Sequence, residues 1–287
     1  MLGKMDNCDV FICTHGRPKH LPAVLDSLKK AKGEFKVWII DSSDKKLNKK
    51  IQKLADEYIH VPGMTPLSTK RNVAIKKSKA DIIVFTDDDC IADENWVEEL
   101  TSGFKNQEIG ACTGKTLPLK GYINSEYEAQ FSFSKIGNEK KIIKNKLFLM
   151  MNRIGHGNNM AFRRKVFEVV GLFNEKKGAG TGIAGEDSEM FYKILRNSYK
   201  IAYNPSAIVY HKHLVPSEKL PELANYNGYG WYLFFKENKR IDFQLMYFVL
   251  ICKYLIKFIR GNREIEKPRL KGILGLEKKK WLAQINK

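Results

Sequence analysis

The chain has 287 residues, which is long enough for one large α/β domain or two modest ones with a sizeable core. Hydrophobic residues make up 43% and charged residues 29% of it, a balance that excludes a largely disordered chain. Lysine and arginine number 50 against 32 acidic residues, so the formal net charge is +18. This charge indicates an anionic partner, whether nucleic acid, a membrane surface or a phosphorylated substrate.

The cysteines are scattered along the chain and include no Cys-x-x-Cys pair. We therefore expect neither a disulfide framework nor a thiolate zinc site. No long apolar stretch follows the first residues, so no secretory signal peptide is expected. The setting is predicted to be reducing and cytoplasmic.

Strands and helices alternate in the first third of the chain. Short apolar runs predict strands at residues 10–14, 37–40, 58–61 and 81–87. Apolar residues recur at helical spacing from Leu21 to Leu28, in a helix that Gly33 is expected to close, and a lysine-rich helix is expected after Asp44. Thr65 and Pro66 indicate the start of a further helix, with the Thr65 hydroxyl as its cap. This alternation predicts an α/β fold with a Rossmann-like, mostly parallel, doubly wound sheet.

The same patterns continue in the second part of the chain. A helix is expected after Asp93, which can cap it, and a short helix is expected to end at Gly171. Further strands are predicted at residues 111–117, after the turn at 155–159, and at 208–211. A glycine-rich loop precedes Asp187 and leads into another helix. Residues 121–150 show no clear period, and we predict no structure for them.

Residues 216–287 form a different, aromatic and basic region that we expect to be helical. The apolar run at 243–259 is too short and too interrupted by polar residues to span a bilayer. Lys253, Lys257 and Arg260 fall on one side of this helix, which favours a helix lying on an anionic membrane surface. The alternative is a helix packed on the main domain or on a second subunit.

The strongest candidate site follows the apolar run at 81–86, where three aspartates stand in a row. Alternate side chains of a strand share a face, so Asp87 and Asp89 are expected to point together and Asp88 the other way. Two adjacent carboxylates at an open sheet edge predict a hard divalent cation, Mg²⁺ or Mn²⁺, that would hold a diphosphate. The alternative is a solvated turn or helix cap, and this stretch alone leaves both open.

Four further residues are candidates for the same edge of the sheet. Asp41 ends the second strand and could bind a base or ribose, or only shape its turn. Arg71 could hold a phosphate or be a surface cation. Asp187 follows the glycine-rich loop and could be a general base beneath a lid, or a helix cap. His211 could bind a metal or be structural.

In this order and spacing, these residues resemble family 2 inverting glycosyltransferases, which have the type-A nucleotide-sugar-binding fold. The resemblance extends from Val10 to about His213. It is carried by Thr14-His15-Gly16-Arg17, Asp41, Lys70-Arg71-Asn72, Asp87 and Asp89 followed by Trp96, the 157–163 turn, Gly185-Glu186-Asp187 and His211.

The resemblance implies donor contacts for the residues that match the family's motifs. Thr14, Arg17 and Asp41 would bind the nucleotide, with Asp41 reading the base. Arg71 would contact the base or the diphosphate, and Asp87 the ribose or the metal. The second strand ends in Asp-Ser-Ser-Asp instead of Asp-Asp-Gly-Ser, so the ribose contacts are not assigned.

The resemblance also implies a metal site and a catalytic base. Asp89 would ligate Mn²⁺ or Mg²⁺ together with Asp87 and His211, although His213 competes for the histidine role. Asp187 would deprotonate the acceptor hydroxyl. Within the triplet, Asp88 is expected to matter least.

The expected function is therefore metal-dependent, inverting sugar transfer from a UDP-, dTDP- or GDP-linked donor to a sugar or lipid-linked acceptor. We expect a role in cell-surface polysaccharide or glycolipid synthesis, in the cytoplasm or at the inner face of the cell membrane, and no nucleic acid as partner. Residues 1–116 would bind the donor, 117–215 the acceptor, and 216–287 the membrane surface.

The alternatives are an enzyme like the sugar nucleotidyltransferases and a basic nucleic-acid-binding protein. The sequence has neither the full glycine-rich loop of the former nor a recognition motif of the latter.

Overall fold

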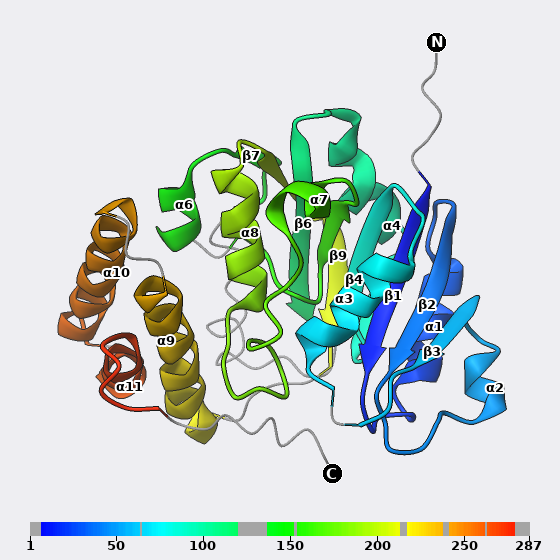
Figure 1. Cartoon of the computed structure of the whole chain (residues 1–287), viewed down its shortest axis with the longest axis horizontal. Coiled ribbons are helices and arrows are strands. Elements are labelled where there is room, and N and C mark those ends of the chain that lie inside the picture. Colours follow the sequence, from blue (N-terminus) through cyan, green and yellow to red (C-terminus); the bar gives the residue numbers. More distant parts are fainter. Residues whose placement is uncertain are drawn as a thin grey trace.

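A computed structural model of the chain describes residues 7–63, 65–119, 137–151, 154–212, 217–237, 241–261 and 263–278. Its centre is a nine-stranded sheet with the order β3-β2-β1-β4-β8-β6-β9-β5, and β7 also pairs with β9 (Figure 1). The strands are β1 (Cys8–Thr14), β2 (Phe35–Asp41), β3 (Glu57–His60), β4 (Ile82–Asp87), β5 (Cys90–Ala92), β6 (Ile109–Pro118), β7 (Lys141–Ile143), β8 (Met160–Arg163) and β9 (Lys200–His211).

The sheet is mixed but mostly parallel, as predicted. β1, β2, β3 and β4 run parallel to one another. β8 is antiparallel to both β4 and β6, and β9 is parallel to β6, so β6 and β9 point in the same direction as β1. β5 and β7 are antiparallel to β9.

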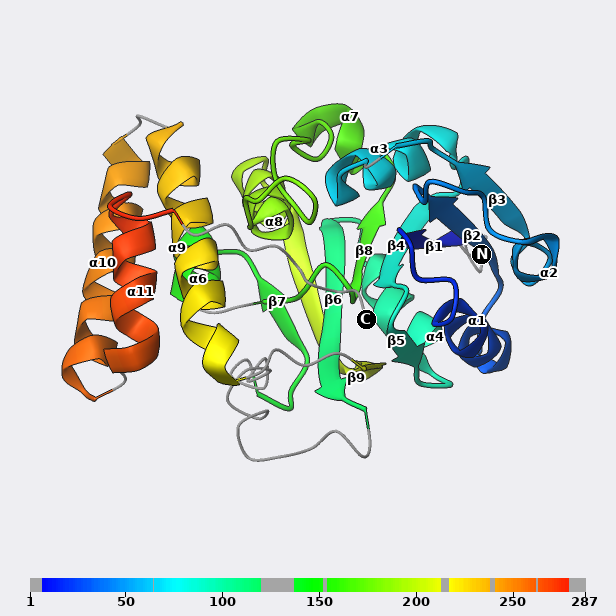
Figure 2. The same ribbon diagram turned by 90° about the horizontal axis from the view of Figure 1, so that it is seen from below.

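Helices cover both faces of the sheet, which confirms the doubly wound arrangement (Figure 2). On one face, α1 (Leu21–Lys30) and α4 (Trp96–Thr101) pack in an apolar cluster with Val10 and Ile12 of β1. On the other, α3 (Leu67–Lys77), α7 (Val166–Val170) and α8 (Glu186–Arg196) pack in a cluster with Phe11. Every residue of β1 is buried because the strand faces apolar side chains on both sides. The short helices α2 (Lys49–Gln52) and α6 (Lys146–Met151) complete this part of the chain.

The C-terminal region is helical, as expected. It consists of α9 (Leu220–Lys236), α10 (Ile241–Ile259) and α11 (Arg263–Ile273), which lie together at one end of the sheet beyond α8 (Figure 1). Phe243 and Leu250 of α10 are fully buried and belong to the same apolar cluster as Met190 of α8. One face of α10 therefore packs on the domain. None of the described helices is both long enough and apolar enough to cross a bilayer.

Two of the expected helix caps are wrong. The cap position of α3 is Pro66, which has no polar side chain, and the Thr65 hydroxyl donates instead to the carbonyl oxygens of Pro62 and Gly63. The carboxylate of Asp93 accepts a hydrogen bond from the Asn95 N–H at 3.0 Å, so it closes the turn before α4. The lysine-rich helix is a single turn, α2.

The segment without a clear sequence period contains β7 and most of α6, and its residues 121–136 lie outside the described part of the chain. The expected division between donor and acceptor halves, at 116/117, falls inside β6, and it stays a prediction.

The Asn159 side chain joins three elements of the core, which gives a prediction for stability. Its amide donates to the carbonyl oxygens of Lys115 and Ala207 at 3.0 and 2.9 Å, and its oxygen accepts from the indole N–H of Trp96 at 2.9 Å. Asn159→Ala leaves these buried groups unpaired, so we expect urea denaturation to show a loss of about 2–4 kcal/mol. The control Asn197→Ala removes an exposed hydrogen bond and should cost less than about 0.5 kcal/mol. Equal losses in the two variants would contradict this role.

Candidate active site

Polar side chains gather where three parallel strands end. In the sheet register, Thr14 of β1 pairs with Asp41 of β2, and Cys13 pairs with Asp87 of β4. The carboxyl ends of parallel strands form the edge at which α/β folds bind ligands. The structure thus brings Thr14, Asp41 and Asp87 to one edge, as expected from the sequence.

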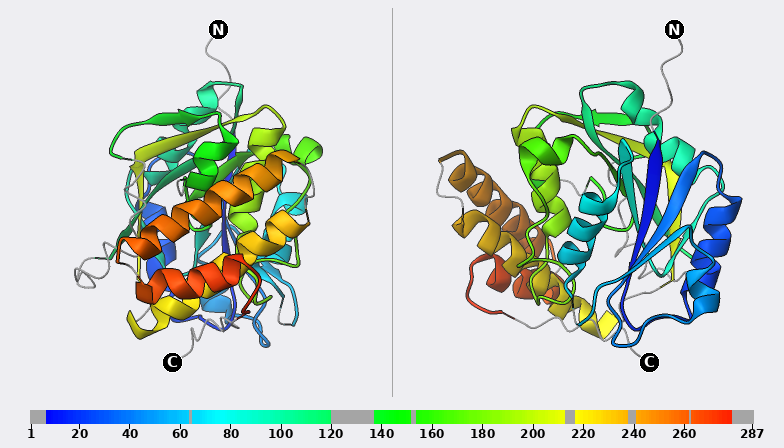
Figure 3. Two further views of the ribbon diagram at one scale, coloured as in Figure 1. Left: turned by 90° about the vertical axis from the view of Figure 1, so that its left-hand side faces the viewer. Right: turned by 45° about the vertical axis from the view of Figure 1, so that its right-hand side comes forward.

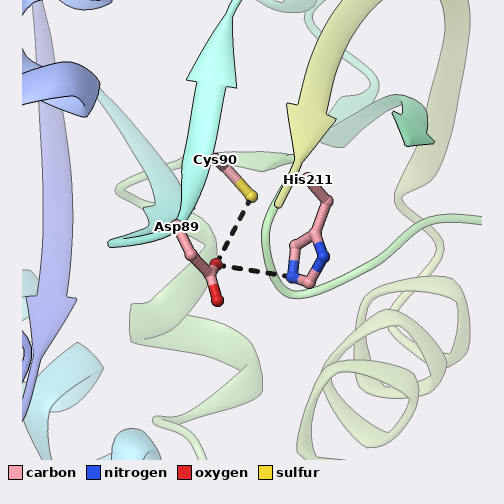
Figure 4. A group of neighbouring side chains, drawn as sticks. All are labelled: Asp89, Cys90 and His211. Atoms are coloured by element: carbon pink, nitrogen blue, oxygen red, sulfur yellow. Dashed lines mark hydrogen bonds and ion pairs between the residues drawn. The ribbon is translucent and has the colours of Figure 1, made fainter. Parts of the chain in front are cut away.

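His211 joins this edge through β5. After β4 the chain turns at Asp88 and Asp89 into β5, whose first residue, Cys90, pairs with His211 at the end of β9. His211 Nε2 lies 3.4 Å from Asp89 Oδ1, and Cys90 Sγ lies 3.9 Å from the same oxygen (Figure 4). Residues more than a hundred positions apart therefore meet because a short antiparallel strand follows the aspartates.

Asp89, Cys90 and His211 can be tested as a metal site by the chemistry of their donors. Their ligand atoms lie within 4.8 Å of one another. Mn²⁺ and Mg²⁺ are hard cations that prefer oxygen ligands, so the buried Cys90 sulfur is a poor ligand for them. A carboxylate oxygen and an imidazole nitrogen remain, and these fit Mn²⁺ or Mg²⁺ completed by donor oxygens. The competing candidate His213 lies outside the described residues.

Asp87 lies beside this group, and the pKa of its carboxyl is raised. Burial raises the pKa of the Asp87 carboxyl, and the neighbouring charge of Asp89 raises it further, while Arg71 acts in the opposite direction. The mutual repulsion of the two carboxylates is the property expected of a site that accepts a cation.

Asp88 is the most enclosed member of the triplet, with no exposed surface. Its Oδ2 accepts a hydrogen bond from the Thr14 hydroxyl at 2.6 Å, and its Oδ1 is 2.8 Å from Arg17 Nη2. Arg17 Nη1 lies 3.0 Å from Asp89 Oδ2. Burial is the largest effect and raises the pKa of Asp88 to about 7, while the Arg17 charge and the Thr14 hydrogen bond act in the opposite direction. The expectation that Asp88 matters least did not anticipate these contacts.

Arg71 is buried, which contradicts the surface-cation alternative. Its side chain is 2% exposed, and its guanidinium lies 2.9 Å from Glu186 Oε1 and 4.0 Å from Asp87 Oδ1. It also donates to the carbonyl oxygen of Gly157 at 3.0 Å. Arg71 therefore links the end of β4 to the start of α8, and it holds the turn before β8.

Asp187 stands in the first turn of α8, where Gly185 occupies the cap position. Its Oδ2 accepts from the Gly157 N–H at 3.2 Å and its Oδ1 from the Ser188 N–H at 2.6 Å. The side chain is partly exposed, unlike that of Asp88. A partly exposed carboxylate, held by backbone donors next to Arg71 and Glu186, can receive a proton from a bound hydroxyl.

Asp41 is fully buried and makes contacts with the loop that follows it and with Tyr58 of β3. One oxygen accepts from the N–H and hydroxyl of Ser43, and the other from the Tyr58 hydroxyl and the Leu47 N–H. These contacts agree with the alternative in which Asp41 shapes the turn. Its role in reading a base stays a prediction.

Lys70 and Glu186 belong to the site but were not assigned roles from the sequence. Lys70 is 5% exposed, and its ammonium donates to the Thr14 carbonyl oxygen and the Ser42 hydroxyl, both at 3.1 Å. Burial lowers the pKa of Lys70. Lys70 and Arg71 lie four and three positions before the buried residue Ala74, so on a helix all three share one face. This spacing was the signal available in the sequence that Lys70 and Arg71 face the sheet.

Comparison with solved structures finds proteins with a similar fold. The mannosyltransferase PcManGT from Pyrobaculum calidifontis, in complex with GDP-Man and Mn²⁺, superposes with a TM-score of 0.57 at 16% identity, over 82% of this chain and 64% of that one. S. aureus TarS residues 1–349, in complex with UDP, give 0.55 at 14% identity, over 90% and 73% of the two chains. At these identities the likeness shows the fold, the type-A glycosyltransferase fold.

Sequence comparison finds related curated proteins. The O-antigen chain rhamnosyltransferase RfbN of Salmonella typhimurium is 33% identical over 150 residues, which cover 50% of this chain and 45% of the relative. The O-antigen chain rhamnosyltransferase WbaN of Salmonella anatum is 29% identical over 152 residues, with the same coverage. The matches thus span about half of each relative's length. A family model described as glycosyl transferase family 2 matches residues 9–171, more than half of the chain, and the protein therefore belongs to glycosyl transferase family 2.

Proposed function

We propose that this glycosyltransferase moves a sugar from a nucleoside-diphosphate donor to a hydroxyl acceptor with inversion, in a reaction that depends on a divalent metal. The observation that carries the proposal is the meeting of Asp87, Asp89 and His211 with Arg71 and Asp187 around the end of β4. The solved neighbours named above were captured with GDP-Man or UDP, which supports a UDP-, dTDP- or GDP-linked donor. Family membership favours sugar transfer over the nucleotidyltransferase and nucleic-acid-binding alternatives.

The donor side of the site supplies ligands and positive charge. Asp89 and His211 would hold the metal, with Asp87 beside them. When bound there, Mn²⁺ or Mg²⁺ would offset the negative charge that grows on the departing diphosphate. Lys70 and Arg71 are buried cations at the same edge and would favour an anionic ligand in their surroundings of low dielectric constant.

The acceptor side supplies the base. The acceptor oxygen would bond to the anomeric carbon as the bond from that carbon to the diphosphate oxygen breaks on the opposite face, and its proton would pass to Asp187. A single displacement of this kind inverts the anomeric centre. Glu186 is the neighbouring carboxylate, but it is already engaged by Arg71 at 2.9 Å, so we assign the role of the base to Asp187.

The acceptor class is proposed from the relatives. RfbN and WbaN are named as O-antigen chain rhamnosyltransferases, so we place this protein in the synthesis of a cell-surface polysaccharide or glycolipid. Its acceptor would be a sugar or a lipid-linked sugar, which is presented at the inner face of the cell membrane.

The surface of α10 fits such a location. Opposite the face that packs on the domain, α10 carries apolar side chains that are 42–81% exposed and recur at helical spacing: Ile241, Leu245, Phe248, Leu255, Ile256 and Ile259. We call these residues the α10 stripe. The helix lies on the outside of the molecule (Figure 3, left).

The occupant that we propose for the α10 stripe is an anionic membrane surface. Lys253, Lys257 and Arg260 recur along one edge of the helix, between its buried and exposed apolar faces. An apolar strip beside cations suits a helix lying in the headgroup region. A second copy of the chain would instead bring two molecules of formal charge +18 together, which electrostatic repulsion opposes.

The Asp187→Asn variant tests the catalytic proposal. The amide cannot accept the acceptor's proton, so the rate of sugar transfer should fall by about 10²–10⁴-fold. Nucleotide binding measured by calorimetry should stay unchanged, because Asp187 is assigned to the acceptor side. Asp26→Asn, on the exposed face of α1, is the matched control and should keep full activity. If Asp187→Asn transferred sugar at the wild-type rate, Asp187 would only stabilise the first turn of α8 and would not be the base.

Vesicle sedimentation tests the membrane surface. We expect the protein to sediment with vesicles that contain anionic lipid, less so at high salt, and not with purely zwitterionic vesicles. Replacing Leu245, Phe248 and Ile259 by glutamine should weaken this binding more than tenfold, because each loses about 1.5–3 kcal/mol of burial when fully inserted. The control Val169→Gln changes an exposed apolar residue of α7 and should have no effect.

Two results would contradict this assignment of the α10 stripe. One is a wild-type protein that ignores anionic vesicles at low salt. The other is a concentration-dependent dimer in light scattering that the triple variant abolishes, which would make the stripe an interface between copies of the chain.

A further inference from the structure

A continuous chain of polar contacts connects β1 with β9 through the aspartate triplet. The Thr14 hydroxyl donates to Asp88 Oδ2 at 2.6 Å, and Asp88 Oδ1 is 2.8 Å from Arg17 Nη2. Arg17 Nη1 is 3.0 Å from Asp89 Oδ2, and Asp89 Oδ1 is 3.4 Å from His211 Nε2. Each carboxylate in this chain uses its two oxygens for different partners.

The contacts of Arg17 fix the orientation of Asp89. A guanidinium is planar and its two terminal nitrogens form a rigid fork, so the ion pair of Nη2 with Asp88 limits where the hydrogen-bonded partner of Nη1 can lie. Asp88 is fully enclosed and is itself held by Thr14, which makes it the fixed end of the fork. Asp89 Oδ2 is the other end, and this leaves Oδ1 directed toward His211.

The positive charge of Arg17 and the negative charge of Asp88 balance each other. Arg17 contributes one positive charge, which Asp88 balances at 2.8 Å. Arg71, 4.0 Å from Asp87, is itself paired with Glu186 at 2.9 Å, so Asp87 and Asp89 together keep negative charge for a divalent cation. Without the charge of Asp88, the guanidinium would be balanced by Asp89 alone and would repel a cation at the same place.

We propose that Asp88 and Arg17 are positioning residues for the metal ligand Asp89. Arg17 orients the Asp89 carboxylate toward His211. Asp88 holds the Arg17 guanidinium in place and balances its positive charge. The inference rests on the proposed function, since it concerns the metal site, and it gives Asp88 a role that the motif alone does not.

The test is the affinity for Mn²⁺ alone, measured on the whole 287-residue chain by electron paramagnetic resonance of free Mn²⁺. Asp88→Asn keeps the size of the side chain but removes the balancing charge, so it should weaken Mn²⁺ binding by about 10- to 100-fold. The double variant Arg17→Gln/Asp88→Asn removes both charges. It should bind Mn²⁺ more tightly than Asp88→Asn, because no unbalanced positive charge of Arg17 remains. It should bind Mn²⁺ less tightly than the wild type, because Arg17 no longer orients the Asp89 carboxylate.

A matched pair of milder variants covers the case in which Asp88→Asn does not fold. Thr14→Val removes the hydroxyl that anchors Asp88 and should weaken Mn²⁺ binding severalfold. Thr86→Val makes the same change in the neighbouring strand, where the hydroxyl has no hydrogen-bond partner within the described part of the chain, and should leave Mn²⁺ affinity unchanged.

The outcomes separate this inference from the proposed function. A wild-type protein that binds Mn²⁺ no better than Asp89→Asn would overturn the metal site itself. Wild-type Mn²⁺ affinity in Asp88→Asn and in Thr14→Val, together with loss of binding in Asp89→Asn, would overturn only the positioning role. A double variant that binds Mn²⁺ more weakly than Asp88→Asn would also overturn it, since the two changes would then act independently.

Discussion

The concentration of carboxylates at the end of β4 is the constraint on which the site depends. A carboxylate removed from water is costly unless cations or hydrogen-bond donors compensate it. Here Arg17 balances the charge of Asp88 and also donates to Asp89, and Arg71 approaches Asp87. The loop after β1 and the first turns of α3 are therefore held in place by the same charges that make the sheet edge suitable for a metal and a diphosphate.

Arg71 extends this compensation to the acceptor side. It contacts Glu186 at the start of α8 and the carbonyl oxygen of Gly157, whose N–H in turn donates to Asp187. The residues assigned to the donor and the proposed base are thus connected through one buried guanidinium. This connection accounts for the burial of a residue that could have been a surface cation.

Much of the fold could be predicted because its strands and helices have clear hydrophobic periods. The strand ends then placed Asp87 and Asp41 at one edge without further information. The position of Asp88 could not be derived, because the alternation rule assumes a strand that continues, whereas the chain turns at Asp88 and enters β5. The contacts of Asp41 and the caps near Thr65 depend on which donors the folded loops bring near, and a sequence pattern does not record this. Likewise, the partnership of Asp89 with His211 could be inferred only from family resemblance, because the short pairing of β5 with β9 has no signal of its own.

The proposal that a metal held by Asp89 and His211 helps to bind the donor can be tested most directly by calorimetry. UDP, dTDP and GDP would be titrated into the wild-type protein and into Asp89→Asn, each with and without Mn²⁺, with circular dichroism to verify folding. We predict that one nucleotide binds the wild-type protein strongly only when Mn²⁺ is present, and that Asp89→Asn loses this Mn²⁺-dependent gain. Equal nucleotide affinity with and without Mn²⁺ in the wild-type protein would contradict the proposed metal-dependent donor site.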